Sequence, residues 1–206
     1  NDQSNHGGTD AFVTRYADDG TRSWTTLVGS AAGDAANGVV LAKGGAVYAV
    51  GRTAGDLNGQ INSGADDAFL TRLSASGQVE WTRLIGTGGN DVANAVGLGS
   101  DGAVYVAGST AGSVLGQISN GGVDGFLSKF TADGTQLWSR QIGTAKGDYV
   151  QSVAVSADGF VYVAGATAGA LPGQSSNGGT DAFLSKYSPN GLLVWTRQIG
   201  SAADDY

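Results

Sequence analysis

The sequence contains no cysteine, no methionine and a single histidine, His6. The lack of cysteine excludes a disulfide framework, a thiolate metal site and a cysteine nucleophile. A single histidine near one end of the chain argues against a Ser-His-Asp triad and a histidine-based metal site. No Gly-Lys-Ser/Thr follows the glycine-rich segments, so a phosphate-binding loop is not indicated. We therefore predict a protein that is not an enzyme and needs no cofactor.

Charged residues are also scarce, at 14% of the chain, and 18 acidic residues stand against 11 basic ones. A net charge of −7 without a run of Lys or Arg is poorly suited to phosphate backbones and anionic membrane surfaces. No apolar run is long enough to span a bilayer. The surface must consist largely of uncharged polar residues and glycine, as in many secreted proteins. We predict no nucleic-acid binding, no membrane insertion, and a location outside the cell or on its surface.

What the sequence has in abundance is glycine, 36 residues against 2 prolines, arranged within a 57-residue repeat. No insertion or deletion interrupts the spacing of the repeat. Self-similarity at a fixed period of this length indicates a solenoid or a propeller. The repeated residues include Asp10, Asp67, Asp124 and Asp181; Asp34, Asp91, Asp148 and Asp205; Trp24, Trp81, Trp138 and Trp195; and Tyr48, Tyr105 and Tyr162.

Each unit holds four short apolar segments separated by turn signals, for example 150–156, 160–165, 181–187 and 192–200. Asp158-Gly159 and Pro189-Asn190-Gly191 favour tight hairpins. The segments are rich in Val, Tyr, Phe, Trp and Thr, and no window has a sustained helical period. These features predict an all-β fold of β-propeller blades, each with four antiparallel strands, because solenoid coils are shorter than this unit.

The pattern N-G-G-x-D-A-F-L-x-K-Y, then W-x-R-Q-I-G, then D-G-x-V-Y-V-A-G-x-T-x-G resembles the bacterial beta-propeller repeat called SBBP. The segment V-A-V-S-A-D-G-F-V-Y-V-A-G is also similar to the first two strands of an NHL-type blade. The resemblance implies a strand order from the centre outwards. The segment of Val153 would be innermost (strand A), followed by the segments of Tyr162 (B), Phe183 (C) and Trp195 (D).

This strand order predicts a single propeller region over 1–206 with about three and a half blades. Residues 1–29 would form the C and D strands of a half blade, 30–86, 87–143 and 144–200 three blades, and 201–206 the start of the next. Propellers close with four to eight blades. We therefore expect the natural protein to continue beyond both ends, the alternative being a ring completed by several chains. Open ends expose strand edges, which we expect further repeats or other chains to cover.

The direction of the strands places the long B–C loops and the D–A loops on one face, and the short turns on the opposite face. A rigid scaffold that presents loops is a common binding arrangement. We predict that any ligand binds on the face with the long loops. The candidate residues are Gln60, Asn62, Asp67, Asp91, Gln117, Asn120, Asp124, Asp148, Gln174, Asn177 and Asp181.

Two interpretations are open for the repeated aspartates. The favoured one is structural, because Asp before a strand accepts hydrogen bonds from nearby backbone amides and fixes the turn. The alternative is a calcium site, since the loops offer carboxylate, amide and carbonyl oxygens, although no D-x-D-x-D-G spacing is present. The candidate calcium ligands are Asp34, Asp67, Asp91, Asp124, Asp148 and Asp181.

The aromatic and amide positions also have two interpretations. Every Trp lies within a strand pattern, which favours packing between blades over stacking on sugar rings. Arg83, Arg140 and Arg197 are predicted to be stacked or solvated surface cations. The glutamines repeated in the long loops, Gln3, Gln60, Gln117 and Gln174, are predicted to bond to the backbone, with ligand binding as the alternative.

These observations favour a non-enzymatic interaction or scaffold module of a bacterial cell surface, acting in adhesion or in the assembly of a surface structure. Its partners would be other protein chains or further repeats of the same protein. The alternative is a glycan-binding propeller that uses the B–C and D–A loops, with calcium as a possible cofactor.

Overall fold

The computed structural model describes residues 3–114 and 116–205, so the outer limits of the predicted first and last segments (1–2 and 206) lie outside the described residues. Within that range the chain forms fourteen strands and no helix. The strands are β1 (Ala11–Tyr16), β2 (Arg22–Val28), β3 (Asp34–Leu41), β4 (Val47–Thr53), β5 (Asp67–Leu73), β6 (Val79–Ile85), β7 (Asp91–Leu98), β8 (Val104–Thr110), β9 (Asp124–Phe130), β10 (Gln136–Ile142), β11 (Asp148–Val155), β12 (Val161–Thr167), β13 (Asp181–Tyr187) and β14 (Leu193–Ile199).

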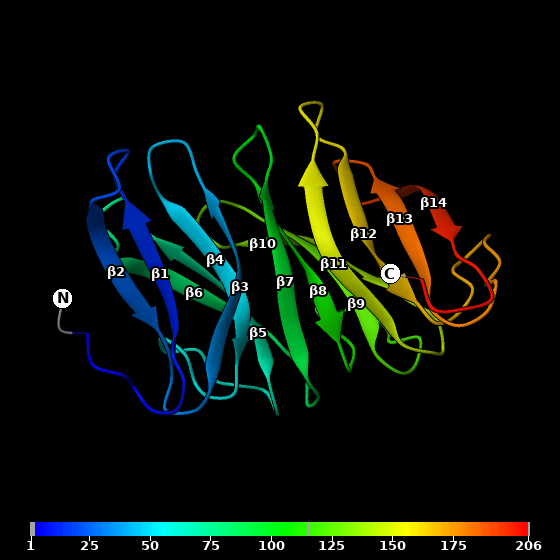
Figure 1. Cartoon of the computed structure of the whole chain (residues 1–206), viewed down its shortest axis with the longest axis horizontal. Helices are drawn as coiled ribbons and strands as arrows, with labels where there is room; N and C mark the ends of the chain where they lie inside the picture. The colour runs from blue at the N-terminus through cyan, green and yellow to red at the C-terminus, as the bar shows by residue number, and fades with distance from the viewer. Residues whose placement is uncertain (1–2, 115, 206) are drawn as a thin grey trace.

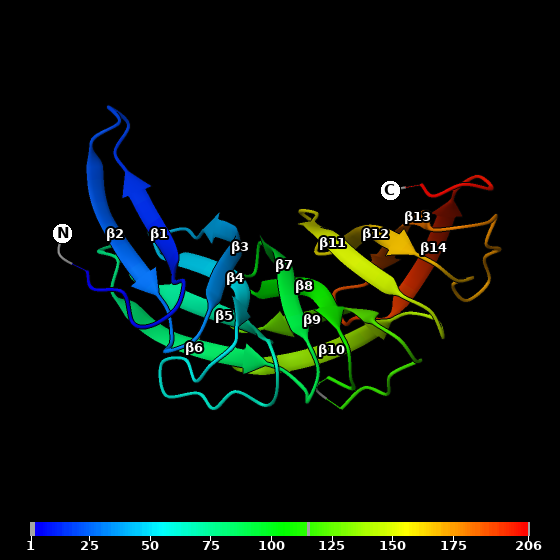
Figure 2. The ribbon, with the colours of Figure 1, turned by 60° about the horizontal axis from the view of Figure 1, so that its bottom comes forward.

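The strands form four sheets, numbered here along the chain. The first sheet has β1 and β2, and the second (β3–β6), third (β7–β10) and fourth (β11–β14) have four strands each. Neighbouring strands in each sheet follow one another in the chain, so β3–β6, β7–β10 and β11–β14 take the places of the predicted strands A to D, and β1 and β2 those of C and D. All pairings are antiparallel. The all-β fold of propeller-like blades predicted from the repeat is thereby confirmed. Among the described residues the sheets form an open arc and not a closed ring, with β1 and β2 at one side and β13 and β14 at the other (Figure 2).

The predicted strand limits differ from the observed ones by one or two residues at most ends. The segment predicted at 150–156 is β11, which begins at Asp148. It begins earlier because the Asp148 N–H donates to the carbonyl of Val123 at 2.7 Å, which draws the loop end into an extended conformation. The turns that follow β3, β7 and β11 lie along the upper edge in Figure 1, the long loops that follow β4 and β8 lie along the lower edge, and the long loop 168–180 (orange) lies at the right.

Consecutive sheets pack face to face through alternate residues of their strands. Between the second and third sheets, Tyr48, Val50 and Leu70 pack against Val106 and Phe126. Between the third and fourth sheets, Tyr105 and Leu127 belong to one buried cluster with Val163 and Phe183. The hydrophobic core is therefore a series of similar interfaces between sheets, as the period-two alternation within each strand requires.

A β-bulge in each of the innermost strands β3 and β7 connects that strand to the next sheet. The register shifts between Ala36 and Gly38 in β3, and between Ala93 and Ala95 in β7. The residue within each shift is an asparagine: Asn37 Nδ2 donates to the Ala93 carbonyl at 3.0 Å, and Asn94 Nδ2 donates to the Val150 carbonyl at 2.8 Å. The bulges thus direct amide side chains to the neighbouring inner strand.

Three tryptophans connect the outermost strand of their sheet to the short C–D turn of the next sheet: Trp24, Trp81 and Trp138. A Cβ built on Gly77 would lie 2.5 Å from the Trp24 ring, and one built on Gly191 would lie 2.8 Å from the Trp138 ring. Trp24 Nε1 donates to the Ala75 carbonyl at 3.0 Å. Only glycine fits here, because the indole lies directly over its Cα and φ is positive at both turns. We call this arrangement the Trp–turn contact, and it shows the packing role that we predicted for the tryptophans.

An arginine accompanies two of these contacts. Arg83 Nε donates to the Gly134 carbonyl at 3.0 Å, and Arg140 Nε donates to the Gly191 carbonyl at 2.6 Å. Each guanidinium also lies over the neighbouring indole, 5.4 Å from the centroid of Trp81 and 5.5 Å from that of Trp138. The arginines are therefore stacked cations that join adjacent sheets, and not only solvated ones.

Candidate functional site

The described parts of the long loops (54–66, 111–114 with 116–123, and 168–180) lie on the same face as the short D–A loops 29–33, 86–90 and 143–147. We call this surface the long-loop face. All candidate ligand residues predicted from the sequence lie on it, either within the loops or at the first residue of the strands that follow them.

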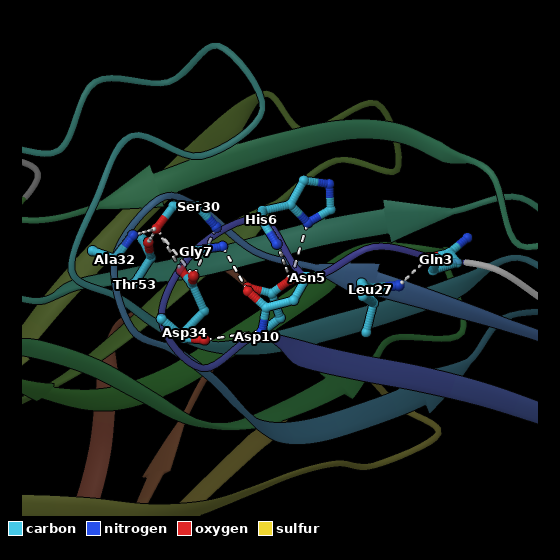
Figure 3. A network of polar contacts seen from close by, with 11 residues as sticks. Gln3, Asn5, His6, Gly7, Asp10, Leu27, Ser30, Ala32, Asp34 and Thr53 are labelled. Carbon is cyan, nitrogen blue, oxygen red and sulfur yellow. Dashed lines mark hydrogen bonds and ion pairs between the residues drawn. The ribbon is translucent and has the colours of Figure 1, made fainter.

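The aspartate that begins each C strand fixes the end of its long loop. Its Oδ2 accepts a hydrogen bond from the backbone N–H four residues earlier, at 2.8 Å for Ser63 to Asp67 and 2.8 Å for Asn120 to Asp124. The same bond runs from His6 to Asp10 at 2.9 Å and can be followed in Figure 3. Because the donor is a backbone N–H, the donating residue can be His, Ser or Asn without loss of the bond.

The aspartate that begins each A strand fixes the D–A loop in the same way. Asp91 Oδ2 accepts the Thr87 N–H at 2.6 Å and the Thr87 hydroxyl at 2.9 Å. Asp148 Oδ2 accepts the Thr144 N–H at 2.6 Å, and Asp34 accepts the Ser30 N–H at 2.7 Å (Figure 3). These are the bonds of the structural interpretation of the repeated aspartates.

The two kinds of loop are also bonded to each other between consecutive sheets. The N–H of each A-strand aspartate donates to the carbonyl of the residue before the preceding C strand. The distances are 2.7 Å from Asp91 to Asp66 and 2.7 Å from Asp148 to Val123. The long-loop face is therefore one hydrogen-bonded layer across the sheets, and not a set of separate loops.

The second carboxylate oxygen of each C-strand aspartate is buried, and it lies against a glycine. No hydrogen-bond partner is found for Oδ1 of Asp10, Asp67, Asp124 or Asp181. A Cβ built on the glycine that follows the D strand, such as Gly86 beside Asp67, would overlap this oxygen. A side chain at this glycine would therefore displace the carboxylate.

This packing bears on the calcium interpretation. Among residues 3–114 and 116–205, no group of three or more His, Cys, Asp or Glu is arranged to hold a metal ion. The Oδ2 atoms are occupied by backbone donors, and the Oδ1 atoms of the C-strand aspartates lie against glycine. Calcium binding by Asp34, Asp67, Asp91, Asp124, Asp148 and Asp181 remains a prediction, which the calcium arm of a binding experiment tests below.

The repeats differ at one position that touches these carboxylates. Gln141 and Gln198 lie in the D strands of the third and fourth sheets, where the first two have Leu27 and Leu84. Gln198 Nε2 donates to Asp181 Oδ2 at 2.7 Å, and Gln141 Nε2 donates to Asp124 Oδ2 at 2.8 Å. The bond from Gln198, with that from the Asn177 N–H, lowers the pKa of Asp181. Burial without such a partner raises the pKa of Asp67, to which the nearby Asp91 charge also contributes.

We expect exchange of these residues to move the two pKa values in opposite directions. Gln198→Leu should raise the pKa of Asp181, and Leu84→Gln should lower that of Asp67, as measured by carboxyl-carbon NMR titration. The stability that the ionised Asp181 contributes to the folded state is lost as the pH falls through its lowered pKa. Ionisation of Asp67 lowers the free energy of unfolding as the pH rises through its raised pKa. An unchanged Asp181 titration in Gln198→Leu would show that the amide is not the cause.

The glutamines predicted to bond to the backbone do so in the two loops nearest the chain ends. Gln3 Oε1 accepts the Leu27 N–H at 2.6 Å (Figure 3), and Gln174 Oε1 accepts the Gln198 N–H at 3.1 Å. Gln60 and Gln117 take part in their loops through the backbone, with their N–H groups donating to the carbonyls of Leu57 and Val114 at 2.9 Å.

The candidate asparagines have different roles. Asn62 is part of the loop framework, because its Nδ2 donates to the carbonyls of Thr53 at 3.1 Å and Ala65 at 3.2 Å. Asn177 Nδ2 donates to the Gly200 carbonyl at 3.2 Å. Asn120 has an exposed side chain beside a cavity of about 230 Å³ between the outer strands of the third and fourth sheets.

Each long loop also has a buried apolar residue that the sequence analysis did not select. Leu57 and Val114 are fully buried, and Leu171 is nearly so. These residues lie at the same repeat position and join the clusters between sheets. Their 57-residue spacing was a signal that could have identified them. Each loop is thus fixed at its start by this residue and at its end by an aspartate.

Two isoleucines project from this fixed framework. Ile61 is 80% exposed and Ile118 is 85% exposed, the highest values among the large apolar side chains of the described residues. They occupy the same position in consecutive loops, where the first and fourth units have Ser4 and Ser175. The sequence analysis missed both because it searched these loops for polar ligand residues.

Comparison with known proteins gives three findings. Residues 137–171 match the family model of the SBBP beta-propeller repeat, which confirms the resemblance found in the sequence. Regulatory protein FlaEY of Caulobacter vibrioides is 28% identical over 165 residues, which cover 73% of this chain and 17% of that protein. The crystal structure of a protein of unknown function from Bacteroides caccae has a TM-score of 0.47 and 12% identity, covering 93% of this chain and 59% of that chain. The matched part of this chain thus spans less than two thirds of the length of either protein.

Proposed function

We propose that this protein is a non-enzymatic interaction or scaffold module that binds a protein partner through its long-loop face, at the surface of a bacterial cell or outside it. The exposure of Ile61 and Ile118 carries the proposal. Apolar side chains held on a rigid framework bind at low entropic cost, because the loops need not be ordered on association. The repeat family and the regulatory relative agree with an interaction role. The low charge of the chain supports the extracellular location.

We expect Ile61→Asp with Ile118→Asp to weaken partner binding at least tenfold, since buried apolar anchors are each worth more than about 1 kcal/mol at interfaces. The measurement is quantitative cross-linking of the purified protein to intact cells of its source, followed by mass spectrometry of the captured protein. Leu192→Asp is the matched control, because Leu192 is 64% exposed and lies in a short turn away from this face. Equal capture by all three proteins would contradict the proposal.

The second candidate function is glycan binding. A cavity of about 490 Å³ between the first two sheets is lined by Gln3, Asn5, His6, Asn58 and Gln78. Amide side chains suit the hydroxyl groups of a sugar, as donors and as acceptors. A glycan array probed with and without calcium tests this function and the calcium prediction together. Signal that requires calcium would support both, and the lack of any signal would remove the glycan candidate.

A further inference from the structure

A cavity of about 250 Å³ lies between the third and fourth sheets. Both of these sheets have all four strands. Small-molecule sites in proteins measure roughly 300–1,000 Å³, so a space of this size suits one ring or one side chain and not a larger ligand. The cavity is lined by residues of two loops of the long-loop face and of the strands beside them: Asn90, Val92, Asn94, Ser109, Val123 and Tyr149.

One wall of the cavity is the face of the third sheet that packs on the fourth. Val92 pairs with Ser109, and Ser109 pairs with Gly125, so these three positions lie on the same face of the sheet. A Cβ built on Gly125 would lie 2.6 Å from Cγ2 of Val150, which places this face against β11. The side chain of Ser109 is therefore directed into the interface between the two sheets.

Ser109 brings a polar group into this interface without a partner. The residue is 7% exposed, and its Oγ has no hydrogen-bond partner among residues 3–114 and 116–205. The amide of Asn94, which also lines the cavity, already donates to the Val150 carbonyl at 2.8 Å. A buried hydroxyl without a partner destabilises the folded state, and native proteins contain few such groups. A ligand that bonds to Ser109 Oγ would remove this cost.

The equivalent place between the second and third sheets is built differently. The positions of Ser109 and Val123 are there taken by Arg52 and Asp66. Arg52 Nη1 donates to Asp66 Oδ2 at 2.5 Å. An ion pair thus lies at the positions where, one unit later, a hydroxyl and an apolar side chain border a cavity. The cavity is therefore a property of one interface and not of the repeat.

The residues around the cavity select a ligand with an apolar body and a polar tip. Val92 and Val123 offer apolar contacts, and none of the six described residues that line the cavity is charged. A charged group would lose its hydration there without gaining an opposite charge. Ser109 Oγ can both donate and accept a hydrogen bond. A phenol ring combines an apolar body with a hydroxyl tip, and tyrosine often fills pockets at protein interfaces.

We infer that this cavity binds a tyrosine side chain of a protein partner, with the phenol hydroxyl bonded to Ser109 Oγ and the ring against Val92 and Val123. The inference rests on the proposed function, because Asn90 and Val123 belong to loops of the long-loop face, and it names a side chain that the partner inserts there. Asn90 is exposed, so its amide is available to the main chain of the partner.

The test is an NMR chemical-shift titration of the isotope-labelled chain with N-acetyl-tyrosinamide, which presents a tyrosine side chain between two peptide groups. We expect saturable shifts of the backbone amides of Asn90, Ser109 and Val123, with a dissociation constant on the order of 1 mM for so small a ligand. N-acetyl-phenylalaninamide lacks only the hydroxyl and should bind about threefold to tenfold more weakly. Ser109→Ala should bind both compounds equally, because the hydrogen bond that distinguishes them is gone.

A second variant fills the cavity with the ion pair that the second sheet carries at these positions. Ser109→Arg with Val123→Asp should weaken binding of N-acetyl-tyrosinamide at least about tenfold, because the space is then occupied. Ser76→Arg with Val194→Asp is the matched control, since it makes the same exchanges at exposed positions that do not line the cavity. Equal melting temperatures would show that the variants are folded, and Ser109→Ala provides the test if the filled variant does not fold.

Three results would overturn the inference: no saturable shift at the three amides, equal affinity of the wild type for the two compounds, or undiminished binding by the folded variant with the filled cavity. Ile61→Asp with Ile118→Asp leaves the cavity unchanged and should bind N-acetyl-tyrosinamide as the wild type does. Because the titration needs no partner and the capture experiment needs no cavity, this inference and the proposed function can fail separately.

Discussion

Replacing Gly108 with alanine is expected to lower the free energy of unfolding by about 3 kcal/mol, the upper part of the range for overpacked interiors. Gly108 lies in β8 opposite the bulge at Asn94, and a Cβ there would overlap the carbonyl oxygen of Val92. The obstacle is backbone and not a flexible side chain, so relief requires the bulge to shift. That shift would also displace the hydrogen bond from Asn94 Nδ2 to the Val150 carbonyl in β11.

Gly88→Ala is the matched control for this prediction. A Cβ on Gly88 meets no heavy atom within 4 Å. The substitution should be neutral or should stabilise the protein by up to about 1 kcal/mol through the unfolded state. Urea unfolding of both variants gives the comparison. Equal midpoints for Gly108→Ala and wild type would mean that the two strands do not approach as closely as the bulge requires.

Phe126→Ala is expected to cost about 3–5 kcal/mol of stability, the usual range for a fully buried phenylalanine. Phe126 is 0% exposed in the cluster between the second and third sheets. Phe12→Ala, at the same repeat position, should change stability by less than about 0.5 kcal/mol, because that side chain is 65% exposed. Chemical denaturation measures both values.

The comparison of these two phenylalanines separates position in the repeat from burial. Comparable losses in both variants would contradict the arrangement, because they would place Phe12 inside a packed interface. A small loss in both would mean that the sheets do not pack face to face. Phe126→Leu offers a further check, since a substitution that keeps most of the volume should recover much of the lost stability.

Much of the fold could be predicted from the repeat and its turn signals. Asp158-Gly159 and the glycine of Pro189-Asn190-Gly191 predicted hairpins, and both glycines have positive φ. The alternation of apolar residues predicted the strands to within two residues. Their limits could not be predicted because they depend on hydrogen bonds to loops from other units, such as that from Asp148 to Val123.

The candidate site was predicted less completely. The repeated aspartates indicated fixed turns, and their hydrogen bonds have that form. The sequence analysis did not identify Ile61 and Ile118, since their exposure depends on where the buried Leu57 and Val114 hold each loop. The sequence favoured a packing role for the tryptophans, but it could not identify the glycine that receives each indole, because that glycine lies 53 residues further along the chain, in another unit.

By itself, the sequence determined the repeat, the all-β class, the four strands of each unit and the turns between them, because these follow from local spacing and turn chemistry. The tertiary structure alone decided which copies of a repeated residue are buried and which are exposed. Phe12 and Phe126 occupy the same position in nearly the same local sequence, and they differ only in whether another sheet lies in front of them. The burial of a residue depends on neighbours that are distant in the chain. Because the repeat gives the units nearly the same local sequence, that sequence does not show which units have such neighbours.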